Sequence, residues 1–151
     1  MAAALAIHIL AAIIWLGGLF LLCVVLQPSV RPLDPATALS LWHRVLSRFL
    51  VWGWISLVLI LTTGITMVFL EFGGFANIPS IHRANMVIGI PAIALYGYLY
   101  FAPWQRFRRA LSSNGLMATE GSIRQVRILM ATILALGLVA SVVSAGARYY
   151  G

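Results

Sequence analysis

The sequence predicts an all-α membrane protein whose four transmembrane helices form one antiparallel bundle. Hydrophobic residues make up 62% of the 151 residues and charged residues only 9%, whereas soluble domains are about 45–50% apolar and about 25% charged. Four uncharged runs are bounded by charged residues, and each is close to the roughly 20 residues that a bilayer-spanning helix needs. The connections are too short to hold a second domain, so residues 1–151 are expected to form a single four-helix domain.

The limits of each expected helix follow from the nearest charges and helix breakers. The first is expected to be a retained transmembrane helix, because it lacks the basic start of a signal peptide and its apolar run is too long for one. Pro91 lies inside the third, where it frees a backbone carbonyl and is expected to kink the helix. The expected helices are 1–30, 49–70, 84–105 and 128–147, and the expected connections are 27–42, 71–80 and 104–122.

Arginine distribution predicts the orientation of these helices. All ten basic residues are arginines, and the first and third connections with their flanking turns hold eight of them. Arg83 and Arg148 are the two on the other side. Because cytoplasmic loops carry the excess of positive charge, the first and third connections are expected in the cytoplasm and both chain ends outside. The lipid bilayer is therefore an expected partner.

His8 is the first candidate functional residue. It is the only polar side chain among residues 1–26, and an imidazole inside a membrane-spanning helix usually faces protein, a ligand or water. Trp15 lies two helical turns further along the same face. Gly18 allows a neighbouring helix or a flat cofactor to approach the backbone closely.

A second group of candidates is expected at the same, outer membrane face. His82 and Arg83 lie at the outer end of the third helix, and Met86 follows His82 by one turn on the same face. Arg148 lies at the outer end of the fourth helix. His43, by contrast, lies beside Arg44 at the cytoplasmic side and is expected to be a solvated interfacial residue. The tryptophans near helix ends, among them Trp42 and Trp104, are expected to belong to interfacial aromatic belts.

Several kinds of chemistry are excluded by what the chain lacks. Its three acidic residues all lie in connections, so paired carboxylates for acid–base hydrolysis are not expected. Its single cysteine, Cys23, excludes an intrachain disulfide and a thiolate cluster. The high positive charge is a topology signal in this membrane context, so nucleic acid is not an expected partner.

Copper is one ligand that the remaining side chains suit. Copper(I) prefers soft thioether ligands, and imidazole binds copper in either oxidation state. His8, His82 and Met86 are therefore predicted copper ligands, with Met67 as a weaker candidate.

Haem b is the alternative that the same residues leave open. Two imidazoles on different helices, His8 and His82, are predicted axial ligands of the iron. Arg83 and Arg148 suit the anionic propionates. Trp15 and Gly18 would line the ring. The protein is expected to be an enzyme, an oxidoreductase, only if haem is bound.

Beyond these residues, the sequence resembles the CopD family of bacterial copper-resistance and copper-transport membrane proteins. The resemblance rests on His8 with Trp15-Leu16-Gly17-Gly18 and Pro28, on Arg48-Phe49, Thr63-Gly64, the stretch from His82 to Met86, Tyr100-Phe101-Ala102-Pro103-Trp104 and Gly146-Ala147-Arg148-Tyr149. It implies a bacterial inner-membrane bundle that handles copper, by binding, import or delivery, at the periplasmic face. The opening is also similar to the haem-binding HemJ proteins, which implies haem binding. The Arg and Tyr-His pair that follow in HemJ are missing from 24–30, so the HemJ oxidase activity is not implied.

A third reading involves no metal. Stripes of small and hydroxyl residues on the second and fourth helices are typical of helix packing, so the chain is also compatible with an assembly subunit that binds partner helices. A second copy of the chain, or a partner membrane or periplasmic metalloprotein, is the expected protein partner. The stripes are Gly53, Ser56, Thr63 and Met67, and Gly137, Ser141, Ser144 and Arg148.

Overall fold

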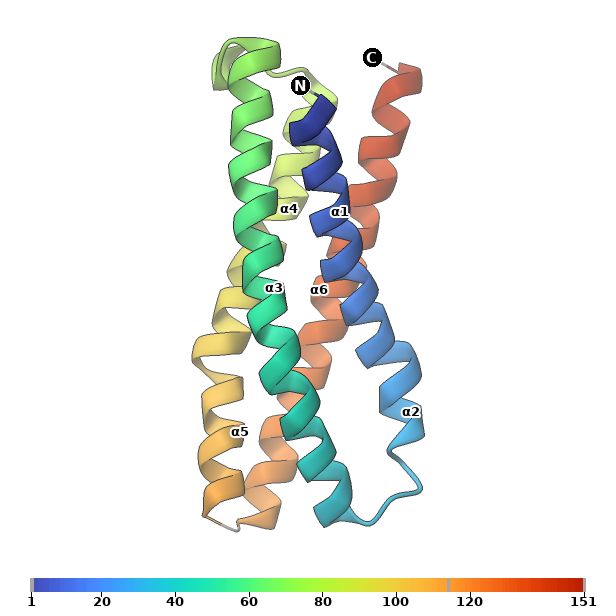
Figure 1. Cartoon of the computed structure of the whole chain (residues 1–151), viewed down its shortest axis with the longest axis vertical. Coiled ribbons are helices and arrows are strands. Elements are labelled where there is room, and N and C mark those ends of the chain that lie inside the picture. The colour runs from blue at the N-terminus through green and yellow to red at the C-terminus, as the bar shows by residue number, and fades with distance from the viewer. Residues whose placement is uncertain (1, 114, 151) are drawn as a thin grey trace.

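The four long helical rods run alternately up and down and form one elongated bundle (Figure 1). The computed structural model describes residues 2–113 and 115–150, with the side chains of 81, 116 and 147–150 excepted. The chain is 92% helical, and the described residues include no strand. The predicted all-α class with four helices long and apolar enough to cross a membrane is therefore confirmed.

The first rod is assembled from three consecutive helical segments, and the third from two. The elements in chain order are α1 (Ala2–Phe20), the π-helical η1 (Leu21–Leu26), α2 (Gln27–Ser29), α3 (Pro35–Phe72), the 3₁₀ turn η2 (Phe75–Asn77), α4 (Ser80–Phe101), α5 (Pro103–Ser112) and α6 (Leu116–Tyr150).

Two expected connections are wrong, because most of their residues are helical. α3 begins at Pro35, where the Asp34 side chain accepts a hydrogen bond from the Thr37 backbone N–H at 2.9 Å. It ends at Gly73, whose left-handed conformation (φ 68°) closes the last turn. Charged side chains do not end a helix, whereas such caps and breakers do. α3 therefore has 38 residues, roughly 57 Å at about 1.5 Å per residue, more than the bilayer core of about 30 Å requires.

The rods pack mainly as two pairs, α1 with α3 and α4–α5 with α6. In the first pair the ring of Phe49 lies directly over Gly18, where a Cβ atom would overlap it. Contacts between α1 and α6 join the pairs, and here Leu16 occupies the space over Gly137. Small residues in these positions bring helix backbones close enough for dispersion contacts to hold them together.

Aromatic side chains fill the centre of the bundle. Tyr96 of α4 is fully buried, and its hydroxyl donates to the Leu50 carbonyl of α3 at 3.0 Å. Trp15 and Trp54 each meet the Tyr96 ring edge to face, with centroids 5.7 Å apart. This geometry is the favoured one for aromatic pairs, and it links α1, α3 and α4.

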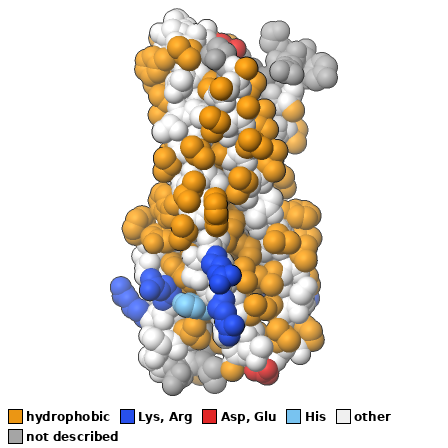
Figure 2. All heavy atoms as spheres, in the orientation of Figure 1, with side chains coloured by type: hydrophobic (Ala, Val, Ile, Leu, Met, Phe, Trp, Pro, Cys, Tyr) orange, Lys and Arg blue, Asp and Glu red, His pale blue; other side chains and the backbone are white. Residues whose placement is uncertain are grey.

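Apart from Ile78 in the connection before α4, the buried core of the described residues occupies the middle and the arginine-rich end of the bundle. It begins near Ala11 and extends to Leu39 and Ile123. In the opposite half, none of the residues in 2–10, 58–72, 82–91 and 138–146 is buried. This half is called the outer half below. Apolar side chains cover the visible face of the molecule there (Figure 2), as expected of a multi-pass membrane protein surrounded by lipid.

The arginine-rich end is a packed extension of the bundle and contains residues that were expected at its surface. Trp42 and Trp104 are only 2% and 3% exposed, so their assignment to an interfacial belt is wrong. His43 is half-buried and stacks on Trp104, with centroids 5.6 Å apart and an interplanar angle of 21°, so it is not a freely solvated residue. Helix α5 brings Trp104 and Phe107 into this position. Arginine side chains gather at one level beside this region (Figure 2).

A candidate metal-binding site at His8

His8 makes one side-chain contact that crosses between helices. Its Nδ1 atom lies 2.9 Å from the Thr63 hydroxyl oxygen, joining α1 to a residue 55 positions away on α3. Gly64 lies beside the ring, and a Cβ atom there would be 3.5 Å from His8 Cε1. The half-buried imidazole therefore faces α3 in the outer half of the bundle, as the sequence predicted for an intramembrane histidine.

The bond to Thr63 also bears on which ring nitrogen of His8 carries the proton. A threonine hydroxyl has one proton, and Thr63 donates it to the Leu59 carbonyl at 2.5 Å. A hydroxyl that donates to a carbonyl can still accept from His8, and that pairing corresponds to the Nδ1–H tautomer. The Ile60 carbonyl of α3 is a second acceptor beside the ring. In the Nδ1–H tautomer of a neutral imidazole the other nitrogen, Nε2, has a free lone pair. This is the arrangement of a metal-binding histidine, whose second nitrogen usually donates to a neighbouring acceptor.

Three side-chain polar atoms are buried without a hydrogen-bond partner in the described part of the chain, and two of them lie on α1 and α4. One is Nε1 of Trp15, on the same helix as His8, and the other is Oδ1 of Asn85 on α4. A buried polar atom without a partner costs about 1–3 kcal/mol, so both atoms are candidates to contact a ligand or water. Asn85 was not among the residues chosen from the sequence. The sequence feature that could have identified Asn85 is its amide side chain near the start of an otherwise apolar run.

His82 and its neighbours lie differently from the expectation. His82 is exposed in the first turn of α4, where its ring is tilted against Phe72 with centroids 5.2 Å apart. The expectation that both imidazoles face the bundle interior therefore fails for His82. Arg83 is also exposed, and Met86 is half-buried one turn further along. The physical reason is that α4 begins only at Ser80, which leaves its first turn beyond the packed part of the bundle.

The cofactor-lining candidates divide in the same way. Trp15 is buried and faces Tyr96 in the bundle centre. Gly18 is covered by Phe49, so its missing Cβ serves helix packing and leaves no room for a ring at that position. The Arg148 side chain lies outside the described residues.

No three His, Cys, Asp or Glu side chains converge as a metal site anywhere in the described ranges. A site at His8 must therefore take its other ligands from elsewhere. Met67 lies one turn beyond Thr63 on the same face of α3 and is half-buried. Its thioether is a soft ligand of the kind that copper(I) prefers.

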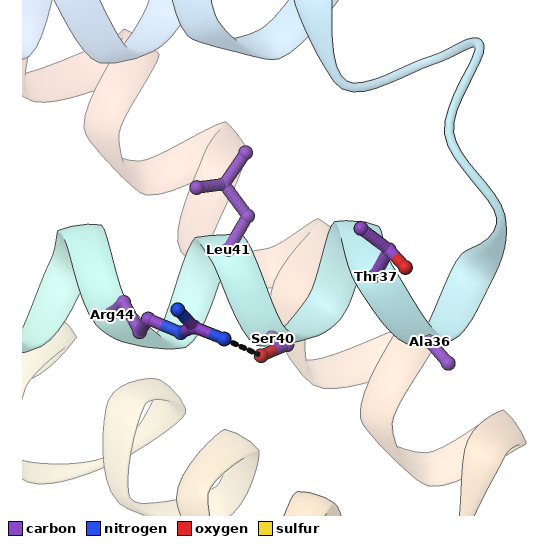
Figure 3. Close-up of a pocket in the computed structure, with 5 residues that line it drawn as sticks. All are labelled: Ala36, Thr37, Ser40, Leu41 and Arg44. Carbon is purple, nitrogen blue, oxygen red and sulfur yellow. Dashed lines mark hydrogen bonds between the residues drawn. The ribbon is translucent and has the colours of Figure 1, made fainter.

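A shallow hollow of about 400 Å³ lies far from His8, at the start of α3. All of its lining residues belong to the first turns of that helix, and the Arg44 guanidinium donates to the Ser40 hydroxyl across it at 3.4 Å (Figure 3). With one helix as its wall, this hollow is a surface feature and not an enclosed binding site.

Comparison of the chain with protein families, with curated proteins and with solved structures finds no match. The resemblance to CopD and HemJ proteins therefore rests on the sequence motifs alone.

Proposed function

We propose that this protein binds copper in the outer half of its bundle, with Nε2 of His8 as the first ligand. The observation that carries the proposal is the His8–Thr63 hydrogen bond, because it orients the imidazole and, in the Nδ1–H tautomer, leaves Nε2 free to bind a metal. In this role the protein handles copper as cargo, as the resemblance to CopD proteins implies.

The soft donors in the outer half support copper(I) in particular. The half-buried thioethers of Met67 and Met86 lie in the same half of the bundle as His8. Imidazole with thioether is a set of ligands that suits copper(I) and disfavours the hard cations Mg²⁺ and Ca²⁺. The exposed His82 is a candidate for the first capture of the ion at the outer end of α4.

Haem b is the second candidate, and the uneven core favours it. The outer half contains no buried residue in its described helical segments, whereas protein interiors are normally closely packed. An apolar macrocycle inserted there, with His8 as an axial ligand, would supply the missing contacts. Arg83 is then a partner for a propionate. Haem would supply redox chemistry.

The proposed location is the bacterial inner membrane, with His8 towards the periplasm. The support is the arginine count, because positive loops stay in the cytoplasm. Copper delivered from the periplasm would then reach His8 without crossing the arginine-rich end of the bundle.

The test is metal content after purification in detergent from copper-supplemented cells. Copper per protein is measured by mass spectrometry, and an absorbance spectrum reports haem by its Soret band. We expect His8→Ala to lose the metal. We expect Thr63→Val to bind about 10–100-fold more weakly, the usual effect of removing the partner of a ligating histidine.

Thr62→Val is the matched control for Thr63→Val. Thr62 is exposed, and its hydroxyl bonds only to the Val58 and Leu59 carbonyls of its own helix. Both substitutions exchange a hydroxyl for a methyl, so a general effect on α3 would appear in both. Wild-type metal content in His8→Ala would refute the proposal. A Soret band that is present in the wild type and disappears in His8→Ala would show that His8 binds haem instead of copper.

A further inference from the structure

A second polar feature lies at the opposite end of the bundle from His8 and concerns Arg127. This residue lies on α6, is half-buried, and its Nε atom is buried without a hydrogen-bond partner among the described residues. A guanidinium has five N–H donors, and burying one of them unpaired is unfavourable. A ligand that accepts a hydrogen bond from Nε would remove this penalty.

The surroundings of Arg127 are positive. Arg31, which follows the first rod, and the Cys23 thiol of η1 both act electrostatically on Arg127, and Arg31 is the cation of the two. The acidic residues nearest in sequence do not neutralise the two arginines. The Asp34 carboxylate already caps α3 through the Thr37 N–H, and Glu120 lies two turns away along α6, about 10 Å. Two neighbouring guanidinium groups that are not neutralised by a carboxylate would suit an anion.

The position of the pair favours an amphiphilic anion. Arg127 is the last charged residue before the apolar run 128–147, which places it at the depth of lipid headgroups. Ile128, the next residue along α6, is exposed. Val24 and Val25 are also exposed, and they belong to η1, which contacts α6. Below this point the first rod leans away from α6 (Figure 1). The guanidinium pair matches the phosphate of a phospholipid, and the apolar surface beside it matches the acyl chains of the same molecule.

We propose that Arg127 and Arg31 bind the phosphate group of an anionic phospholipid at the arginine-rich end of the bundle. A guanidinium group can bind two phosphate oxygens with two parallel hydrogen bonds, whereas a lysine ammonium cannot. Basic sites between transmembrane helices on the positively charged side bind lipid headgroups in the same way. The lipid would also fill the angle between the first rod and α6 and so join the two pairs of rods.

The test uses the full-length protein in a neutral detergent. Short-chain phosphatidylglycerol is added, and binding is measured as the rise in the thermal unfolding midpoint with lipid concentration. Short-chain phosphatidylcholine and inorganic phosphate are added in parallel. We expect a saturable rise with phosphatidylglycerol, a smaller one with phosphatidylcholine and none with phosphate. An equal rise with inorganic phosphate would overturn the lipid assignment.

Variants locate the effect at the proposed residues. We expect Arg127→Gln and Arg31→Gln each to weaken phosphatidylglycerol binding about tenfold, which is the worth of one charge-assisted hydrogen bond. Arg124→Gln is the matched control, because Arg124 lies one turn earlier on α6, is exposed and carries the same charge. We expect its binding to change by about twofold or less.

Arg127→Lys separates hydrogen bonding from charge, since it retains the charge and removes the Nε donor. We expect it to bind less tightly than the wild type and more tightly than Arg127→Gln. Each variant is compared with its own lipid-free midpoint, so a change in basal stability does not affect the result. Wild-type affinity in Arg127→Lys, or equal losses in Arg124→Gln and Arg127→Gln, would show that only net charge matters and would overturn the proposal.

Discussion

At the scale of single residues, the bundle depends on a few positions where two helices meet through one side chain. Tyr96 is the clearest case, because its ring contacts two tryptophans and its hydroxyl is held by the Leu50 carbonyl. That hydroxyl is accommodated only because Gly53 has no side chain. Tyr96 and Gly53 therefore act as a matched pair across α3 and α4.

Gly53→Ala is expected to destabilise the protein by about 1–3 kcal/mol, the usual cost of overpacking. The added Cβ atom would overlap the Tyr96 hydroxyl, which lies on a rigid ring in a filled core. Gly89→Ala is the control, because no other side chain lies within 4 Å of the place that its new Cβ atom would take. It should be neutral or slightly stabilising, since alanine favours the helix. Thermal unfolding in detergent measures both, and equal losses would contradict the assignment.

Asp34 links folding to pH at the start of α3. Hydrogen bonds from Thr37 lower the pKa of its carboxyl below the ordinary value of 3.8. The folded state thus favours the ionised form, and this stabilisation is present above pH 3.8 and is lost as the pH falls through the lower, folded-state pKa. Asparagine also caps helices but does not titrate. We expect Asp34→Asn to lose less stability than the wild type between about pH 5 and pH 2, and identical pH profiles would refute this role.

At the scale of elements, helix ends explain why the rods are longer than the apolar runs. The charges that bound the runs lie inside continuous helices, while Asp34, Pro103 and Gly73 mark real ends. The short α5 shows the consequence. It alternates exposed arginines with Trp104 and Phe107, which are buried against His43 and α6. The arginine-rich end therefore has a hydrophobic core of its own.

Phe107→Ala should reveal how much this small core contributes. Phe107 is fully buried, and removing such a ring costs about 3–5 kcal/mol. Arg108→Ala, at the next position of α5, removes an exposed side chain whose only described partner is Gln105 at 3.4 Å. It should change the free energy of unfolding by about 0.5 kcal/mol or less. Thermal or denaturant unfolding compares the two, and similar effects would show that α5 is not packed.

At the scale of the whole molecule, the two ends of the bundle differ in kind. One end has a packed aromatic core surrounded by arginines, and the other has His8 among helices that bury no residue in their described outer segments. A tight core holds the rods in place at one end, whereas the helical segments of the other end leave their described side chains at least partly exposed. The two proposed sites, for a metal and for a lipid phosphate, lie at opposite ends and are therefore testable independently.

The orientation of the whole molecule stays a prediction. The arginine count of eight against two places the α2–α3 and α5–α6 connections in the cytoplasm and both chain ends in the periplasm. Reporter fusions after Ser112 and at the chain end should report cytoplasm and periplasm, respectively. The opposite pattern would place His8 on the cytoplasmic side and would refute periplasmic copper handling.

The fold class and the four spans could be predicted from sequence because they depend on local properties. Length and hydropathy decide whether a segment crosses a bilayer, and arginine counts bear on its direction. The isolated His8 was also visible, since one polar residue in an apolar run is conspicuous without any structure.

Only the tertiary structure decided what each side chain meets. The partner of His8 is Thr63 on another helix, Asn85 is buried while His82 is exposed, and Gly18 is covered by Phe49. The physical reason is that helices apolar on every side have no polar face to show which way they turn. Their rotation and register are determined by contacts between helices, and those contacts exist only in the assembled bundle.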